Sequence, residues 1–322
     1  MFAKVLVPLD GSPLGERAIS HAASVAHTFG STLLLLRVIP VRQRGGAVPL
    51  DIIDRRLGHA EAGAYLDAIA ADLRGRGVTV ETAVTEGQPA EQIVDVLRRH
   101  GADLVVLTSH GCGGSTEFPI SGTAHKVVSR AGTSVLMVPP PERASSGVPS
   151  GTAYRRILVG LDGSRRGDWS LGPAAALARQ AGAELLLVHV VQVPETVEEP
   201  RSAELREAAD QLVRLNSQAA ARHLAQVKAR LESPELHVRT RIEVSRRIPE
   251  ALANLAEAER ADLVVLTAHG TSITTHGLYG AIAVQVLAEA RRPLLVAQDV
   301  PSPLEGSRTG HAVQRETAVN HL

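Results

Sequence analysis

The stretch Lys4-Val-Leu-Val-Pro-Leu-Asp-Gly-Ser12 occurs again, 152 residues later, as Arg156-Ile-Leu-Val-Gly-Leu-Asp-Gly-Ser164. A second block, Gly101-Ala-Asp-Leu-Val-Val-Leu-Thr-Ser-His-Gly111, recurs as Arg260-Ala-Asp-Leu-Val-Val-Leu-Thr-Ala-His-Gly270 at an offset of 159. Two matched blocks in the same order indicate a duplicated domain. Because the offset grows by seven residues, the second copy carries an insertion between the two blocks.

Each copy alternates short apolar runs with segments of helical periodicity. In the first copy we predict strands at 4–9, 33–39, 79–84, 103–108 and 134–138, and helices at 14–29, 55–74, 90–100 and 122–130. The second copy repeats this alternation, and a longer amphipathic helix at about 202–231 takes up the insertion. Strict alternation with right-handed crossovers requires a parallel sheet covered by helices on both faces. The sequence therefore predicts an α/β chain of two duplicated doubly wound domains, each with a five-stranded parallel sheet.

The 322 residues divide at a segment rich in proline, serine and glycine. We predict a first domain at 1–140, a linker at 141–153, a second domain at 154–300 and a flexible C-terminal tail at 301–322.

Composition excludes several classes of protein. Lys and Arg number 34, as do Asp and Glu, so charge gives no reason to expect a nucleic acid or an anionic membrane as partner. Seven aromatic residues provide few platforms for stacking bases. The one cysteine, Cys112, excludes an internal disulfide framework and suits a reducing compartment. We find neither a signal peptide nor an apolar run of membrane-spanning length, so we expect a cytoplasmic protein with no membrane association.

Two features in each copy fall where doubly wound sheets bind ligands, beyond the carboxyl ends of strands where the strand order reverses. The first strands end at Asp10 and Asp162, and glycine-rich loops at His110–Thr123 and His269–Ala281 follow the fourth strands. A glycine-rich loop that opens onto a helix offers free backbone N–H groups and the positive end of the helix dipole. Such a loop suits a phosphate group.

At these residues the chain resembles the universal stress protein family in its tandem form. The resemblance rests on Val-Pro-Leu-Asp-Gly-Ser after the N-terminus, on the Ala-Asp-Leu-Val-Val-Leu-x-x-His-Gly blocks, and on Thr-Ser-Val-Leu-Met-Val-Pro139. It spans about residues 1–140 and 154–298. It implies Rossmann-like or flavodoxin-like domains and a stress-linked adenine-nucleotide-binding protein.

The family's nucleotide-binding members carry a glycine, two residues, a glycine, nine residues, and a glycine followed by Ser or Thr. In the first copy Thr108 stands at the first glycine and Gly111 at the second, and ten residues precede Gly122-Thr123. The resemblance implies that the first-copy nucleotide contacts are Asp10 and Val38 at the adenosine, and Gly111, Gly122 and Thr123 at the phosphates.

The second copy keeps the spacing and loses the hydroxyl. Thr267 stands at the first glycine, Gly270 at the second, and nine residues precede Gly280, which Ala281 follows. The corresponding contacts implied for this copy are Asp162, Val190, Gly270 and Gly280. The resemblance implies ATP as the ligand. Since neither loop contains Lys or Arg before its last glycine, backbone amides, the helix dipole and a bound Mg²⁺ would neutralise the phosphates.

Simpler interpretations compete with these. Asp10 followed by Gly-Ser is also an ordinary strand end with turn chemistry, and each glycine-rich loop could be a crossover that binds nothing. His110 and His269 have no second ligand nearby in sequence, so we predict no metal site. Cys112 near His110 suggests a catalytic dyad, but Thr271 takes its place in the second copy.

Three functions are compatible with these patterns and with the resemblance, from which alone the stress role comes. The first is an adenine-nucleotide-binding regulator or sensor of stress, which is not an enzyme or hydrolyses ATP very slowly, because no general base is evident. The second is an interaction or scaffold protein of the same fold without nucleotide. The third, a hydrolase or nucleotidyl transferase, lacks a catalytic constellation. The apolar last strands at 134–138 and 293–297 would be exposed edges unless paired. The resemblance implies association through these strands, so we expect the halves to pack as an intramolecular pseudo-dimer, with further dimerisation to a homodimer.

Overall fold

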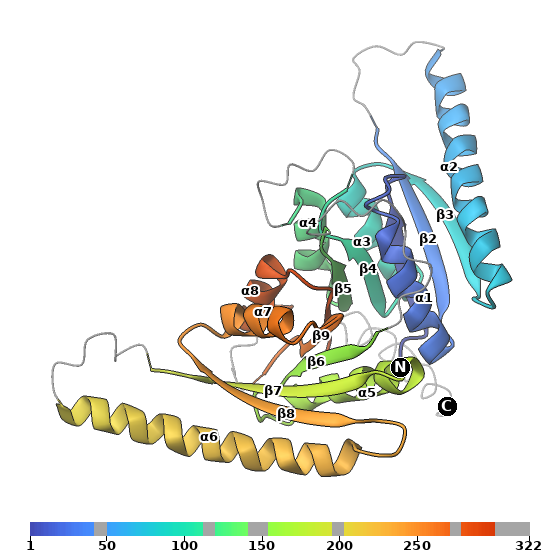
Figure 1. Cartoon of the computed structure of the whole chain (residues 1–322). Helices are drawn as coiled ribbons and strands as arrows, with labels where there is room; N and C mark the ends of the chain where they lie inside the picture. Colours follow the sequence, from blue (N-terminus) through green and yellow to red (C-terminus); the bar gives the residue numbers. More distant parts are fainter. Residues whose placement is uncertain (42–49, 112–119, 141–153, 195–202, 271–277, 300–322) are drawn as a thin grey trace, which may run out of the picture.

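The computed structural model describes residues 1–41, 50–111, 120–140, 154–194, 203–270 and 278–299, apart from the side chains of 50–54, and its strands form one sheet (Figure 1). The first half contains β1 (Lys4–Leu9), α1 (Arg17–Phe29), β2 (Thr32–Ile39), α2 (Leu50–Gly75), β3 (Val80–Glu86), α3 (Pro89–Arg99), β4 (Leu104–Thr108), α4 (Gly122–Ala131) and β5 (Ser134–Val138). The second half contains β6 (Arg156–Gly160), the short 3-10 helix η1 (Gly167–Ser170), α5 (Leu171–Ala181), β7 (Glu184–Gln192), α6 (Ala203–Leu231), β8 (Val238–Ser245), α7 (Ile248–Ala258), β9 (Leu263–Thr267), α8 (Ala281–Glu289) and β10 (Leu294–Ala297).

The strand order is β3-β2-β1-β4-β5-β10-β9-β6-β7-β8, so the five strands of each half stay together. Within each half all pairs are parallel, which confirms the predicted α/β doubly wound architecture. The halves meet where β5 pairs antiparallel with β10, with Leu136 opposite Leu295. The two apolar strands that would otherwise be exposed edges therefore cover one another.

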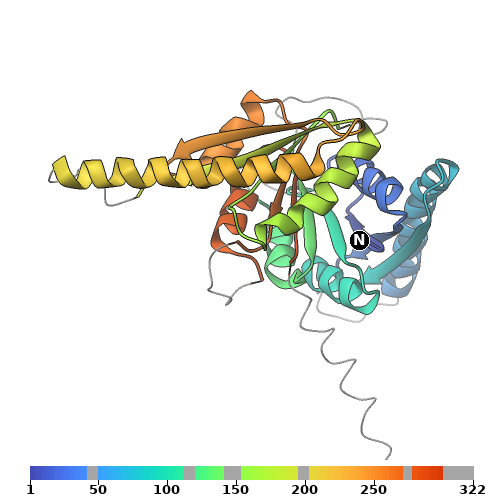
Figure 2. The same ribbon diagram turned by 90° about the horizontal axis from the view of Figure 1, so that it is seen from below.

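Helices cover both faces of the sheet, as Figures 1 and 2 show. Side chains of α1, α2, α5 and α6 share one buried cluster with the sheet, and those of α3, α4, α7 and α8 share a second. Strand residues alternate between the clusters: Leu33 and Leu35 belong to the first, Leu34 and Leu36 to the second. This alternation explains why the strands are continuously apolar.

Glycines end the first helix of each half. Gly30 follows α1 at φ 66°, and Gly182 follows α5 at φ 63°, a left-handed conformation in which glycine carries no steric cost. The helix predicted over 14–29 begins only at Arg17, because the preceding residues form turns. The Ser12 hydroxyl accepts from Gly15 N, and Arg17 N donates to Leu14 O, three residues back. The helix predicted over 55–74 begins five residues earlier than expected, at Leu50.

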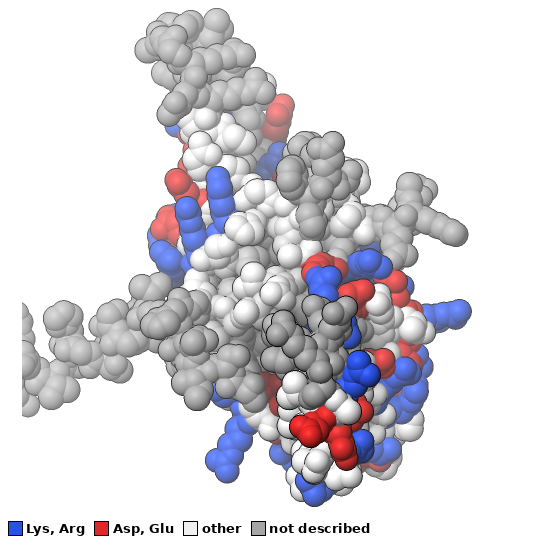
Figure 3. All heavy atoms as spheres, turned by 90° about the vertical axis from the view of Figure 1, so that its left-hand side faces the viewer, with Lys and Arg blue, Asp and Glu red and all other residues white. Residues whose placement is uncertain are grey.

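The long helix of the second half is its main departure from the first. Helix α6 has 29 residues and its counterpart α2 has 26, so α6 takes up only part of the seven-residue insertion. One end of α6 extends beyond the sheet (Figures 1 and 2). Figure 3 shows both signs of charge intermixed on the face seen there, in keeping with a formal net charge of zero.

An aspartate fixes the start of the first strand in each half. Asp262 Oδ2 accepts hydrogen bonds from the backbone N–H groups of Arg155 (2.7 Å) and Arg156 (2.9 Å). Asp103 does the same for Ala3 and Lys4. These bonds satisfy backbone donors at the start of β1 and of β6, the central strands of the two halves of the sheet.

We expect Asp262→Ala to lower the free energy of unfolding by about 1–2 kcal/mol, because two backbone donors lose a charged acceptor. Urea denaturation measures the change. The control is Asp95→Ala, which removes an exposed ion pair to Arg99 within α3 and should cost about 0.5 kcal/mol or less. Equal losses in the two variants would contradict the structural role of Asp262.

The predicted linker at 141–153 and tail at 301–322 lie outside the described residues, so the division into domains stays a prediction. Within the described ranges, none of the helices combines the length and the apolar character needed to cross a membrane.

Candidate functional site

The carboxyl ends of the strands meet at one edge of each half of the sheet. Strand order reverses between β1 and β4 in the first half and between β6 and β9 in the second. Asp10 follows β1 and Asp162 follows β6, so each acid lies at the reversal point of its half. This is the position at which doubly wound sheets bind ligands.

Each acid lies directly against a loop glycine. A Cβ atom on Gly270 would lie 2.1 Å from Oδ2 of Asp162, and one on Gly111 would lie 2.1 Å from Oδ2 of Asp10. Real Cβ atoms do not approach so closely, so only glycine fits at either position. The structure therefore brings together two pairs of residues that the sequence had suggested separately.

The other carboxylate oxygen of each acid stabilises a turn. Asp162 Oδ1 accepts hydrogen bonds from the backbone N (3.0 Å) and the hydroxyl (2.7 Å) of Ser164. Asp10 Oδ1 makes the same contacts with Ser12. The turn interpretation is thus correct for Oδ1, while Oδ2 faces the glycine-rich loop.

A cavity of about 480 Å³ opens at this edge of the second half. Its walls come from the ends of β6, β7 and β9, from Ile248 and Leu252 of α7, and from the first turn of α8. Apolar and polar lining atoms are both present, which is typical of small-molecule sites. All of the residues implied for this half lie around it, namely Asp162, Val190, Gly270 and Gly280.

The residues implied for the first half are less closely gathered. Asp10 and Gly111 are in contact, and Val38 packs on the same face of the sheet as α3 and α4. Gly122 and Thr123 are exposed in the first turn of α4, and a Cβ atom on Gly122 would meet nothing within 4 Å. No close backbone approach requires a glycine there.

The structure aligns the start of α4 with the start of α8 in a different register from the one that the sequence motif suggested, in which Gly122 corresponded to Gly280. In the structure Ser121 N donates to Ser109 O, and Gly280 N donates to Ala268 O, each at 2.7 Å. Ser109 and Ala268 are 159 residues apart, and so are Ser121 and Gly280; the same offset relates the preceding strands. Ser121 is therefore the counterpart of Gly280, and nine residues precede the helix start in both halves.

This register corrects the pairing and reveals a residue that the sequence analysis missed. The signal was present, because the offset of 159 continues from the fourth strand through the helix to the fifth strand. Matching glycine with glycine had aligned Gly122 with Gly280, which is one residue beyond the true counterpart, Ser121.

The helix starts also differ chemically. The hydroxyl of Ser121 accepts a hydrogen bond from Ala124 N and so caps α4. Gly280 has no side chain, and α8 has no side-chain cap. The first N–H groups of α8 therefore have no acceptor from their N-cap residue, at a helix end that lines the cavity.

Two histidines line the cavity, His189 in β7 and His269 after β9. His269 Nδ1 lies 2.8 Å from Oδ1 of Asp299, and Asp299 also accepts a hydrogen bond from Arg166 Nε at 2.6 Å. His189 lies near the end of β7, and its pKa is lowered by burial, an effect that the charge of Asp162 opposes only in part and that His223 reinforces. The sequence analysis missed His189 and Asp299, because only the fold brings them beside the predicted residues.

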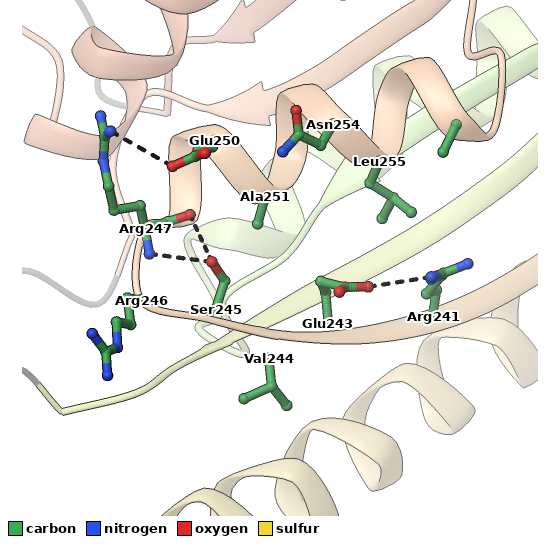
Figure 4. Close-up of a pocket in the computed structure, with 11 residues that line it drawn as sticks. Arg241, Glu243, Val244, Ser245, Arg246, Arg247, Glu250, Ala251, Asn254 and Leu255 are labelled. Atoms are coloured by element: carbon green, nitrogen blue, oxygen red, sulfur yellow. Dashed lines mark hydrogen bonds and ion pairs between the residues drawn. The ribbon is translucent and has the colours of Figure 1, made fainter. Parts of the chain in front are cut away.

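A second cavity, of about 570 Å³, lies between β8 and α7 (Figure 4). Four of its charged side chains pair with one another, Arg241 with Glu243 and Arg247 with Glu250. It lies away from the strand reversal point. The cavity at Asp162 is therefore the stronger candidate for a ligand site.

Within the part of the chain that the structure describes, no group of three or more His, Cys, Asp or Glu side chains is arranged to hold a metal ion. Cys112 lies outside the described residues, so its suggested dyad with His110 has no described geometry. His110 Nδ1 instead lies 3.0 Å from the hydroxyl of Ser109.

Comparison with known proteins identifies a family to which both halves of the chain are similar. The family model described as "Universal stress protein family" matches residues 1–139 and again 153–298. A universal stress protein of Mycolicibacterium smegmatis is 27% identical over 306 residues, which cover 91% of this chain and 96% of the relative. A universal stress protein of Mycobacterium tuberculosis is 29% identical over 235 residues, 72% of each chain.

A solved structure agrees in fold. The crystal structure of a universal stress protein from Archaeoglobus fulgidus matches with a TM-score of 0.61 and 16% identity. The match covers 92% of this chain and 98% of that one. The likeness therefore extends over both halves.

Proposed function

Because the chain belongs to the universal stress protein family, we propose that it binds an adenine nucleotide in the cavity of its second half and acts as a stress-linked regulator or sensor. The observation that carries this proposal is the convergence of Asp162, Gly270 and the uncapped start of α8 on one cavity. A cytoplasmic location belongs to the proposal and suits a chain with a single cysteine.

The residues around the cavity fit ATP by their chemistry. The carboxylate of Asp162 would accept hydrogen bonds from ribose hydroxyls, and the strand end at Val190 offers an apolar wall for the base. Gly270 and Gly280 would allow phosphates to approach the backbone, where the N–H groups of α8 favour an anion. Mg²⁺, if carried by the phosphates, would neutralise charge that no arginine or lysine of the loop can balance.

We propose that the second half provides the working site. In the first half the Ser121 hydroxyl already accepts from an N-terminal amide of α4, so a phosphate would have to displace it. Gly280 imposes no such competition on α8. One nucleotide per chain is therefore the expected stoichiometry.

We propose that ATP turnover is absent or slow, so that the bound nucleotide, and not its hydrolysis, regulates the protein. The hydrolase alternative now has a specific candidate, His269, whose ring Asp299 orients. Measurable ATP hydrolysis that disappears in His269→Gln would favour that alternative over a binding regulator.

The antiparallel pairing of β5 with β10 supports a further part of the proposal, an intramolecular pseudo-dimer. A loop of the second half also contacts the first, because the hydroxyl of Tyr279 donates to Thr133 O. Since Tyr279 lines the cavity, this contact offers a physical route by which a bound nucleotide could alter the junction.

Calorimetric titration of ligand-stripped protein with Mg-ATP tests the proposal. We expect one site per chain with micromolar affinity, roughly −8 kcal/mol. Asp162→Ala should weaken binding about tenfold, because a charged hydrogen-bond acceptor is lost. The matched variant Asp10→Ala should bind as the wild type does.

No heat of binding, together with no nucleotide released from protein as purified, would leave the scaffold function as the better account. Its support is the imperfect motif, in which Thr267 and Ala281 replace the glycine and the hydroxyl residue of the family pattern.

A further inference from the structure

Helix α6 carries two apolar stripes, and only one of them faces the protein. The buried stripe consists of Ala209, Ala220, Leu224 and Val227. On a different face Leu205, Leu212 and Leu215 remain 57%, 45% and 54% exposed. Three exposed leucines on one helix are unusual for a surface that serves only to cover a sheet.

The spacing of the exposed stripe is that of a two-helix coiled coil. Leu205, Ala208, Leu212, Leu215 and Ala219 follow one another at intervals of three, four, three and four residues. Apolar residues at these intervals form the narrow seam along which two helices pack. At the end that extends beyond the sheet, α6 has no neighbouring helix on its outer side in Figures 1 and 2.

We propose that this stripe binds the same stripe of a second copy of the chain, so that two α6 helices form an antiparallel pair about a twofold axis. In this register Leu212 of each copy meets Leu215 of the other, and Ala208 meets Ala219. The largest side chains then lie at the centre and the small ones on either side. A closed, symmetric interface of this kind uses one patch twice.

Charge selects the antiparallel orientation. Glu204 precedes Leu205 on the flank of the stripe, and Arg222 takes the next seam position after Ala219; the two lie 18 residues apart, which is about 27 Å along a helix. The antiparallel register places Glu204 of one copy beside Arg222 of the other, and does so twice. A parallel pair would instead set the two Arg222 side chains against one another, with each Glu204 about 27 Å away along the helix.

The short seam is sufficient for dimerisation because α6 is already folded in each chain. An isolated helical segment as short as this seam, residues 205–219, would be marginal in water, since ordering it costs conformational entropy. Here Leu224 and Val227 anchor the C-terminal part of α6 to the sheet, so association does not bear that cost. The interface is separate from the nucleotide cavity and does not depend on the proposed function.

Analytical ultracentrifugation tests the pairing. At a chain concentration of about 100 μM, we expect the wild type to sediment at twice the 34.0 kDa of one chain. Leu212→Glu with Leu215→Glu should restore the single-chain mass. Leu57→Glu, at an equally exposed leucine of α2, should leave the dimer intact. Circular dichroism confirms that the variants are folded.

A wild type of single-chain mass, or a dimer that survives the double substitution, would overturn the proposal. Disulfide trapping tests the orientation independently, in a Cys112→Ser background. Glu204→Cys mixed with Arg222→Cys should yield a cross-linked dimer, while neither variant should do so alone. Cross-linking of Arg222→Cys with itself would show a parallel pair, in which each seam residue meets its own counterpart, and would contradict the proposed register.

Discussion

Replacement of Gly270 by valine is expected to weaken Mg-ATP binding by more than about 100-fold, or at least about 2.7 kcal/mol. A Cβ atom at this position would lie 2.1 Å from Oδ2 of Asp162, so the side chain must push the carboxylate or the loop out of place. Either movement removes a proposed contact to the ribose and the close backbone approach to the phosphates. Calorimetric titration measures the loss.

The first half supplies a matched control. Gly111→Val introduces the same clash, 2.1 Å from Oδ2 of Asp10. Both valine variants should therefore lower the free energy of unfolding by about 1–3 kcal/mol. Gly111→Val should nevertheless bind Mg-ATP as the wild type does. If Gly111→Val abolished binding and Gly270→Val did not, the working site would be in the first half. Unchanged binding in both would remove Asp162 and Gly270 from the site.

The stability of the protein is expected to fall by about 3 kcal/mol as the pH drops from 6.5 to 4, through His21 alone. His21 on α1 is buried, and its Nδ1 lies 2.9 Å from the hydroxyl of Tyr154, a fully buried residue of the second half. Burial, and then the charge of Arg17, lower the pKa of His21 to about 4. The folded protein therefore keeps this ring neutral where the unfolded chain, with a pKa near 6.5, takes up a proton.

The sign follows from proton uptake. Between pH 6.5 and 4 the unfolded state binds more protons at this site, so falling pH favours unfolding. The stability from the neutral ring is fully present above pH 6.5, and no further loss arises from His21 below pH 4. Urea denaturation at a series of pH values measures the slope.

A double variant isolates the contribution of His21 from the other titrating groups. His21→Leu with Tyr154→Phe removes both polar partners together, which avoids leaving either one buried and unpaired. Its stability should depend on pH less steeply than that of the wild type across this range. His27→Gln, at an exposed histidine of the same helix, should keep the wild-type slope. Equal slopes in all three proteins would show that His21 titrates normally.

Much of the architecture could be predicted because it depends on local pattern. Apolar runs and helical periodicity indicated the alternation of strands and helices, and the repeat at Asp10 and Asp162 indicated the duplication. Element boundaries were less certain. The turn at Ser12 shortened α1, because the Ser12 side chain accepts a hydrogen bond from Gly15 N and so competes with helix formation.

The candidate site was predictable only in part. Strand ends and glycine-rich loops pointed to the edge at which the cavity opens, and the structure places Asp162 against Gly270 there. The register of the helix starts was not recovered, because two neighbouring candidates, Ser121 and Gly122, satisfy the sequence pattern almost equally. Their roles as nucleotide contacts stay a prediction until binding is measured.

The sequence by itself determined the duplicated fold and the edge of each half at which polar groups gather, since both follow from periodicity along neighbouring residues. Only the tertiary structure decided which distant groups meet. It paired β5 with β10, set Asp299 beside His269, and made Ser121 rather than Gly122 the counterpart of Gly280. It also left Leu212 exposed on α6 while Leu224 is buried, because exposure depends on which face the sheet covers. No local pattern contains that choice.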